Sequence, residues 1–250
     1  MDSVLPIILP SFHSRDLLLT CMRSFEKFAP DRAVKLRYIV VENSDDTSYK
    51  DEVLERFPNA TWINNLTKLR GSEANAVGVE VALKEIDETW AFMAHIDTCV
   101  THPMFFSVLF RKTLEECDLV GTVLDPIRIN AVHISGLLTT MRLASKVSYY
   151  PRYDNDGTML LDVGDELTEY ADRHGMRRFC FQNTFNNPEL IDGLPEKFAN
   201  FNVDRSLDEE GNVMFMHLGR GTLKTRGKYS KAGKVSVEEW VEFCGDLLDD

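Results

Sequence analysis

The segment AFMAHIDTCV, residues 91–100, carries an acidic residue, Asp97, directly after an apolar run. The apolar residues before Asp97 are typical of a strand that is buried on both faces. A carboxylate at the end of such a strand is costly unless it is paired or bound to a cation. His95 adds an imidazole two positions earlier. The two residues predict either a cation site or a turn in which Asp97 caps the chain and His95 is a core histidine.

Two further polar clusters follow apolar runs. The run at 4–11 ends in Pro10 and Ser11, and the run at 35–44 ends in Glu42 and Asn43. In parallel sheets, ligands bind outside the carboxyl ends of the strands. We therefore expect both clusters to lie at the same edge of a sheet as Asp97.

The elements that position these residues alternate in type through the first half of the chain. Strand-like apolar runs occupy residues 4–11, 35–44, 60–65, 89–97 and 117–124. Between them, apolar residues recur at helical spacing over 14–28, 48–57, 72–86 and 102–117. This alternation predicts βαβ units and a mostly parallel sheet flanked by helices, the α/β class. The second half is less regular, with helices expected at 165–175 and 236–250 and a strand at 212–221. We find no clean linker and expect one domain over 1–250.

Composition limits the classes of function. The net charge of -12 argues against general nucleic-acid binding, which needs a basic surface. The five cysteines are scattered without a CxxC pair, which indicates free thiols in a reducing compartment. Asp2 stands where a signal peptide would be basic, and no apolar run reaches the roughly 18 residues of a membrane helix. These features predict a soluble cytoplasmic protein with no transmembrane segment.

Five motifs in order resemble the family 2 glycosyltransferases, which have the GT-A fold. The resemblance covers about residues 4 to 220. The motifs are LPIILPSFHSRDLLLTCMRSF, YIVVENSDDTS, NNLTKLRGSEANAVGVEVA, HIDTCV and DVGDELTEYADRHGMR. By this resemblance, residues 1–124 form the nucleotide-sugar-binding half, and residues 125–250 form the acceptor-binding and catalytic half.

The resemblance implies a divalent cation, Mn²⁺ or Mg²⁺, that bridges Asp97 to the diphosphate of a nucleotide-sugar donor. The family usually carries two acidic residues here, and His95 stands in place of the earlier one. An imidazole at that position could still ligate Mn²⁺. His217 in FMHLGRG matches a late histidine that serves related enzymes as a further ligand. The alternative for His217 is a buried histidine that bonds to the backbone.

The donor's other contacts also follow from the resemblance. Pro10 and Ser11 match positions that face the base, and Glu42 and Asn43 match positions that contact the base or ribose. A simple turn at ENSDD is the alternative for the second pair. Arg70 would pair with the phosphates, with a solvated surface charge as its alternative.

Gly71, beside Arg70, would let the backbone approach the phosphates closely. A basic segment late in the chain could close over a diphosphate or bind a phosphorylated acceptor, or it could be an exposed tail. Its cationic residues are Arg220, Lys224, Arg226, Lys228, Lys231 and Lys234.

An inverting transferase needs a general base for the acceptor hydroxyl, and this family takes it from an acidic segment before a helix. LDVGDELTEY supplies Asp165, our first choice, and Asp162, our second. Asp165 could instead serve as the cap of the helix that follows.

The sequence thus predicts an inverting, hexosyltransferase-like glycosyltransferase that acts on a saccharide or lipid-linked acceptor hydroxyl. The resemblance implies surface polysaccharide or glycoconjugate assembly, in the cytoplasm or peripherally at the inner membrane face. One alternative is a non-catalytic nucleotide-sugar-binding protein, which the His95 replacement favours. A sugar nucleotidyltransferase is less favoured, because PSFHSRD lacks that class's glycine-rich loop after the first strand.

Overall fold

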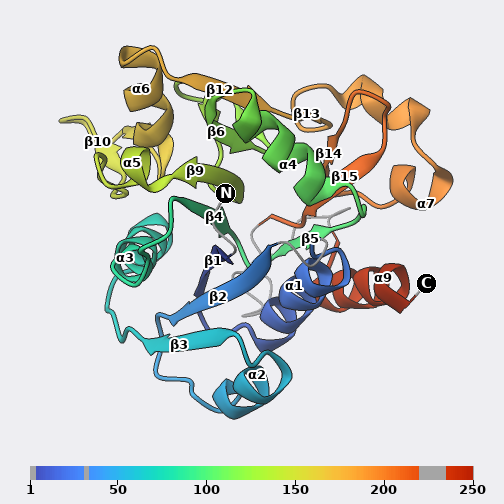
Figure 1. Cartoon of the computed structure of the whole chain (residues 1–250), viewed down its shortest axis with the longest axis horizontal. Coiled ribbons are helices and arrows are strands. Elements are labelled where there is room, and N and C mark those ends of the chain that lie inside the picture. Colours follow the sequence, from blue (N-terminus) through green and yellow to red (C-terminus); the bar gives the residue numbers. More distant parts are fainter. Residues whose placement is uncertain (1–3, 31–33, 220–234, 250) are drawn as a thin grey trace.

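A seven-stranded sheet with the order β12-β6-β9-β4-β1-β2-β3 forms the centre of the computed structural model, which describes residues 4–30, 34–219 and 235–249 (Figure 1). The strands are β1 (Val4–Ser11), β2 (Lys35–Glu42), β3 (Ala60–Asn64), β4 (Trp90–Ala94), β6 (Cys117–Gly121), β9 (Gly136–Thr140) and β12 (Arg177–Cys180). Strands β1 to β4 run parallel, as does β12 with β6, whereas β9 is antiparallel to both of its neighbours. The predicted α/β architecture is confirmed.

Helices cover both faces of this sheet (Figure 1). One face carries α1 (Arg15–Lys27), α2 (Lys50–Arg56), α4 (Phe105–Leu114) and α9 (Val237–Asp249). The other face carries α3 (Ser72–Leu83), α5 (Met141–Ala144) and α6 (Asp165–Arg173). Successive strand residues point to opposite faces, so Ile7 and Leu9 join the first core and Ile8 joins the second. This explains why the strands read as continuous apolar runs.

A second, antiparallel sheet has the order β13-β14-β15-β5. Its strands are β13 (Gln182–Asn183), β14 (Asp204–Leu207), β15 (Val213–His217) and β5 (Thr98–Val100). Because β5 follows β4 after three residues, the chain passes from the large sheet to the small one through the turn that holds His95 and Asp97. Asp97 therefore lies in a turn between two strands, and the expected strand over 89–97 ends earlier, at Ala94.

The second half of the chain contributes several short elements. They are β7 (Leu124–Asp125), β8 (Ala131–Val132), β10 (Arg152–Tyr153), β11 (Met159–Leu161), the 3-10 helix η1 (Pro188–Gly193) and α7 (Glu196–Ala199). Strands β9 and β12 also come from this half, so both parts of the chain build the central sheet. The division into two functional halves stays a prediction, and the basic residues from Arg220 to Lys234 lie outside the described residues.

The start of β9 packs closely against its neighbours. A Cβ atom on Gly136 would lie 2.4 Å from Thr122 Oγ1 and 2.8 Å from Phe215 Cε1. Since Phe215 belongs to β15, only a glycine lets the two sheets approach this closely here.

All five cysteines are free thiols, as expected. Among the described residues, no helix has both the length and the apolar character needed to span a membrane.

Candidate metal centre

Three side chains from distant parts of the chain converge beside the turn between β4 and β5. The ligand atoms of His95, Asp97 and His217 all lie within 4.8 Å of one another. His217 Nε2 lies 3.5 Å from Asp97 Oδ1, and Asp97 is only 5% exposed. The buried carboxylate that the sequence singled out therefore has two imidazoles beside it.

Strand pairing explains why His217 reaches Asp97. Strand β15 runs antiparallel to β5 and places His217 opposite Thr98. The backbone N–H of Leu218 donates to the carbonyl oxygen of Asp97 at 2.9 Å. The end of β15 is thus fixed against the turn by backbone bonds.

The ring of His95 contacts α3, where its Nε2 lies 2.8 Å from the side-chain amide nitrogen of Asn75. The backbone N–H of His95 donates to Ser135 O at 3.2 Å. An imidazole that ligates a metal commonly donates its other N–H to an oxygen. If His95 ligates through Nδ1, its Nε2–H would donate to the amide oxygen of Asn75 after a half-turn of that amide, which exchanges its oxygen and nitrogen. Burial lowers the pKa of His95 to about 4, although Asp97 pulls that pKa upward. The ring is therefore neutral near pH 7, which is the form that binds cations.

The chemistry of these donors defines which cations fit. Two imidazoles and one carboxylate suit Mn²⁺, Fe²⁺ or Zn²⁺, whereas Mg²⁺ prefers an all-oxygen shell. The cluster of His95, Asp97 and His217 therefore fits a divalent transition-metal ion.

A third imidazole, His133, lies beside the cluster and was missed by sequence reasoning. Its ring centroid is 5.4 Å from that of His95 and 5.9 Å from that of His217. The antiparallel pairing of Ala94 in β4 with Gly136 in β9 brings His133 there. The signal in the sequence was a histidine just before the apolar run at 136–140, but nothing local shows which strand that run pairs with.

The candidate base residues lie in an acidic group around Arg128, a residue that the sequence also did not single out. Arg128 Nε donates to Asp165 Oδ2 at 2.8 Å, and Arg128 Nη2 lies 3.0 Å from Asp125 Oδ2. The Oδ2 of Asp162 is farther from Arg128 Nη2, at 3.8 Å. The side chain of Asp165 is 1% exposed and that of Asp162 is 23% exposed. Of this pair, Asp162 is the more exposed to solvent.

Asp165 lies at the start of α6, but it is not the helix cap that its structural alternative expected. The N-cap residue itself is Gly164, with φ of +80°, and Asp165 is the first helical residue. Asp165 Oδ2 also accepts the backbone N–H of Asp162 at 2.8 Å. Burial raises the pKa of Asp165, while its bond to Arg128 pulls that pKa down. The Asp162 carboxylate in turn raises the pKa of His95, which places it within electrostatic reach of the metal cluster.

Glu42 is fully buried and already bonded within the chain. Its Oε1 accepts the backbone N–H groups of His13 at 3.3 Å and Ser44 at 3.0 Å, and its Oε2 accepts the hydroxyl of Tyr49. Ser11 Oγ lies 3.2 Å from the same hydroxyl. These bonds fix the turn after β2, in line with the structural alternative, and a contact between Glu42 and a nucleotide stays a prediction.

Asn43 is buried in the same way. Its Nδ2 donates to Ala74 O at 2.9 Å, and its Oδ1 accepts from Asn65 at 2.7 Å. Pro10 is half-buried against α3, since a Cβ on Gly78 would lie 3.1 Å from Pro10 Cβ. Asn43 and Pro10 thus join the strand ends to α3.

Arg70 and Gly71 stand directly before α3. Arg70 is exposed, and Gly71 has φ of +56°, which opens the chain into the helix. The same first turn of α3 carries Asn75, which contacts His95. Arg70 and Gly71, the predicted phosphate-binding pair, therefore lie at the end of α3 that contacts the cluster of His95, Asp97 and His217.

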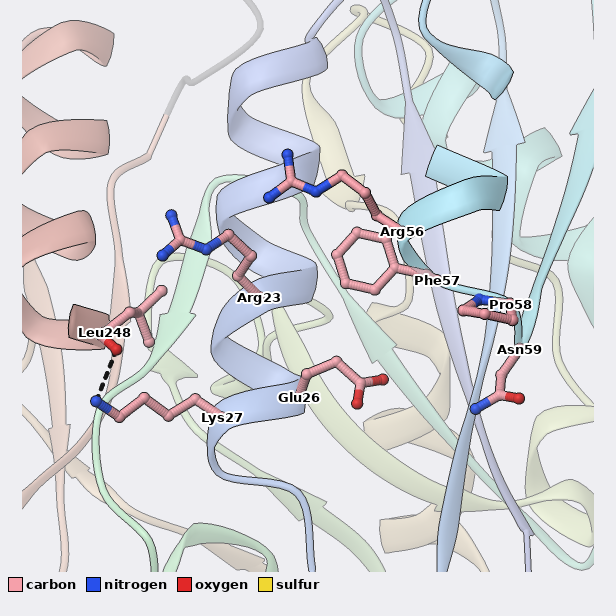
Figure 2. Close-up of a pocket in the computed structure, with 8 residues that line it drawn as sticks. All are labelled: Arg23, Glu26, Lys27, Arg56, Phe57, Pro58, Asn59 and Leu248. Carbon is pink, nitrogen blue, oxygen red and sulfur yellow. Dashed lines mark hydrogen bonds between the residues drawn. The ribbon is translucent and has the colours of Figure 1, made fainter. Parts of the chain in front are cut away.

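A hollow of about 390 Å³ lies near the amino end of β3, away from the candidate cluster at the carboxyl ends of the strands. Its walls are formed by Arg23, Glu26, Lys27, Arg56, Phe57, Pro58, Asn59 and Leu248 (Figure 2). Lys27 Nζ donates to the carbonyl oxygen of Leu248 at 2.7 Å, and Arg23 binds Asp249 at 2.9 Å. These cations cap the end of α9 and are already paired, so the hollow is not part of the candidate site.

Comparison with known proteins supports the fold. No protein-family profile and no curated protein matches the chain. The mannosyltransferase of Pyrobaculum calidifontis in complex with GDP-Man and Mn²⁺ is similar in structure, with a TM-score of 0.53 and 14% identity over 71% of this chain and 54% of that chain. The chain thus spans about half the length of that enzyme.

A second solved structure is similar over more of its own length. Glucosyl-3-phosphoglycerate synthase from Mycobacterium tuberculosis, in complex with Mn²⁺ and UDP-glucose, has a TM-score of 0.50 and 12% identity over 71% of this chain and 69% of that chain. At such identities the likeness shows the fold alone. The chain has the GT-A fold, as the order of its motifs implied.

Proposed function

We propose that this chain, which has the GT-A fold, transfers a sugar from a nucleotide-diphosphate donor to an acceptor hydroxyl. The observation that carries the proposal is the cluster of His95, Asp97 and His217 at the carboxyl edge of the parallel strands. Ligands bind at that edge in open α/β sheets. The two similar structures hold Mn²⁺ together with a nucleotide sugar, which supports the same pairing here.

His95, Asp97 and His217 would hold the cation, which we propose is Mn²⁺. A bound cation of this kind neutralises charge on the departing nucleotide diphosphate. The two imidazoles support Mn²⁺ over Mg²⁺. Arg70 and the first turn of α3 would approach the same phosphates, because Asn75 of that turn already contacts His95.

We assign the general base to Asp162 and not to Asp165. The acceptor oxygen would form a bond to the anomeric carbon of the donor while the bond between that carbon and the phosphate oxygen breaks. The proton of the acceptor hydroxyl would pass to Asp162. Asp162 is the more exposed carboxylate and has the longer contact to Arg128. Asp165 holds Arg128 and the backbone N–H of Asp162, so it positions the base. Direct displacement of this kind inverts the configuration at the anomeric carbon.

A non-catalytic binding protein is the competing function, since His95 replaces an acidic residue. The ligand atoms of His95, Asp97 and His217 lie within 4.8 Å of one another, which supports His95 as a ligand in place of the acidic residue. The acceptor would be a saccharide or lipid-linked hydroxyl, and glycoconjugate assembly is its proposed setting. Turnover separates the two functions, because a binding protein would hold the donor without consuming it.

The first test is calorimetric titration of the protein with UDP, GDP and dTDP in Mn²⁺, Mg²⁺ or EDTA. We expect one nucleotide to bind only with a metal ion, and Asp97→Asn to abolish that binding. Asp192→Asn, at an exposed aspartate, is the matched control and should bind as the wild type does. NMR of the anomeric proton would then follow the donor and report the configuration of the product. The proposal fails if the wild type binds no nucleotide under any condition.

A further inference from the structure

The hydrogen bonds of His133 determine which of its ring nitrogens carries the proton. Its Nδ1 lies 3.2 Å from the backbone nitrogen of Ser135 and 2.9 Å from the Ser135 hydroxyl. A backbone N–H can only donate, so Nδ1 must present its lone pair to it. A neutral imidazole has one N–H, and in His133 that N–H is therefore on Nε2.

The same bonds separate His133 from the metal ligands. A ligand nitrogen needs a free lone pair, but the lone pair of Nδ1 accepts from Ser135 and Nε2 carries a hydrogen. His133 also lies outside the group whose ligand atoms come within 4.8 Å of one another. Its ring nevertheless lies 5.4 Å from that of His95, between centroids. His133 therefore presents a donor beside the cation site.

The Nε2–H of His133 has no hydrogen-bond partner among the described residues. The residue as a whole is half-buried. Arg128, whose charge acts on His133, is already bonded to Asp165 and Asp125. The charge of Arg128 is therefore already balanced by carboxylates. The Nε2–H of His133 remains available as a neutral hydrogen-bond donor for a phosphate oxygen at the cluster.

We propose that His133 donates its Nε2–H to a phosphate oxygen of the nucleotide diphosphate that the metal cluster holds. This assignment rests on the proposed function. It makes His133 a contact for the anionic leaving group, distinct from the cation ligands. Ser135 is the positioning residue, because its N–H fixes the His133 tautomer while its carbonyl oxygen accepts the backbone N–H of His95.

The test uses His133→Phe, which removes both ring nitrogens, and His133→Gln, which keeps a donor near the position of Nε2. Mn²⁺ binding alone is measured by electron paramagnetic resonance, and nucleotide binding is measured by calorimetry in saturating Mn²⁺. We expect both variants to bind Mn²⁺ within about twofold of the wild type. We expect His133→Phe to bind the diphosphate roughly ten- to a hundredfold more weakly, with partial rescue by His133→Gln. His217→Ala is the ligand control and should lose Mn²⁺ itself.

Imidazole ¹⁵N NMR of the metal-free wild type supplies a readout that needs no nucleotide. We expect the proton of His133 on Nε2, with Nδ1 bare. A proton on Nδ1, a loss of Mn²⁺ in His133→Phe as large as in His217→Ala, or unchanged diphosphate binding in His133→Phe would each overturn the inference alone. A wild-type protein that binds Mn²⁺ but no nucleotide diphosphate would overturn the proposed function and this contact together.

Discussion

His217 and Asp97 stand about 120 residues apart in the sequence, yet His217 Nε2 lies 3.5 Å from Asp97 Oδ1. The antiparallel register of β15 on β5 produces this contact, and the bond from Leu218 N–H to Asp97 O secures it. A buried carboxylate between two imidazoles is stable when a cation or a proton balances its charge. The chemistry proposed for this chain depends on that contact.

The cluster should discriminate between cations. We expect Mn²⁺ to bind at least about tenfold more tightly than Mg²⁺, because two of the three ligands are imidazoles. His217→Asp should reduce the ratio of Mn²⁺ to Mg²⁺ affinity, because it replaces an imidazole ligand with a carboxylate. Competition of Mg²⁺ against Mn²⁺, followed by electron paramagnetic resonance, measures both effects. Equal affinities in the wild type would show that the imidazoles do not ligate.

Asp162 and Asp165 should have separable roles. We expect Asp162→Asn to lower kcat by roughly 10²- to 10⁴-fold, because it removes the proton acceptor, while the melting temperature hardly changes. Donor consumption under saturating donor and Mn²⁺ measures kcat.

Asp165→Ala should act mainly on stability. It leaves Arg128 Nε and the N–H of Asp162 without their acceptor, so the free energy of unfolding should fall by about 1–3 kcal/mol. Urea denaturation measures this change. The assignment is reversed if Asp165→Asn abolishes turnover while Asp162→Asn retains it.

The metal-free protein should lose stability in mild acid. The pKa of His95 is 6.5 in the unfolded chain and about 4 in the folded protein, since burial disfavours the charged ring. Between these values the unfolded state binds more protons, so stability falls as the pH drops from about 6.5 toward 4. Melting temperatures in EDTA should show this fall, with a shallower slope in His95→Gln.

The close approach of the two sheets should make Gly136 sensitive to enlargement. The added methyl group of Gly136→Ala would meet Thr122 and Phe215 below contact distance, and we expect a loss of about 1–3 kcal/mol in unfolding free energy. The control is Gly193→Ala, where a Cβ atom meets nothing within 4 Å. Urea denaturation of the pair should separate them clearly, and equal midpoints would show that β9 can shift to accommodate the methyl group.

The sequence predicted the parts of the site that follow from local pattern. Helical and strand periodicity located the elements of the first half within a few residues. Asp97 stood out because a charge after an apolar run needs a partner. Its convergence with His217 came only from the order of motifs that resembles a known family, because no local pattern encodes a contact across about 120 residues.

His133 and Arg128 were missed for a physical reason. Both lie in a stretch whose strands β7 and β8 are two residues long, and such strands are too short to show periodicity. Their places depend on long-range pairing, above all that of β9 with β4. The order of preference between Asp165 and Asp162 likewise depended on burial, which their spacing alone does not reveal.

The long separation of β5 and β15 in the sequence has a consequence for how the protein folds. His95 and Asp97 come early in the chain, whereas His217 comes after both the long irregular stretch and β14. The complete set of ligands can form only after this loop has closed, and closing a long loop is entropically costly and slow. A cation that binds the finished cluster would then stabilise only chains that have completed this last step. The moment of metal uptake during refolding would therefore report when β15 pairs with β5.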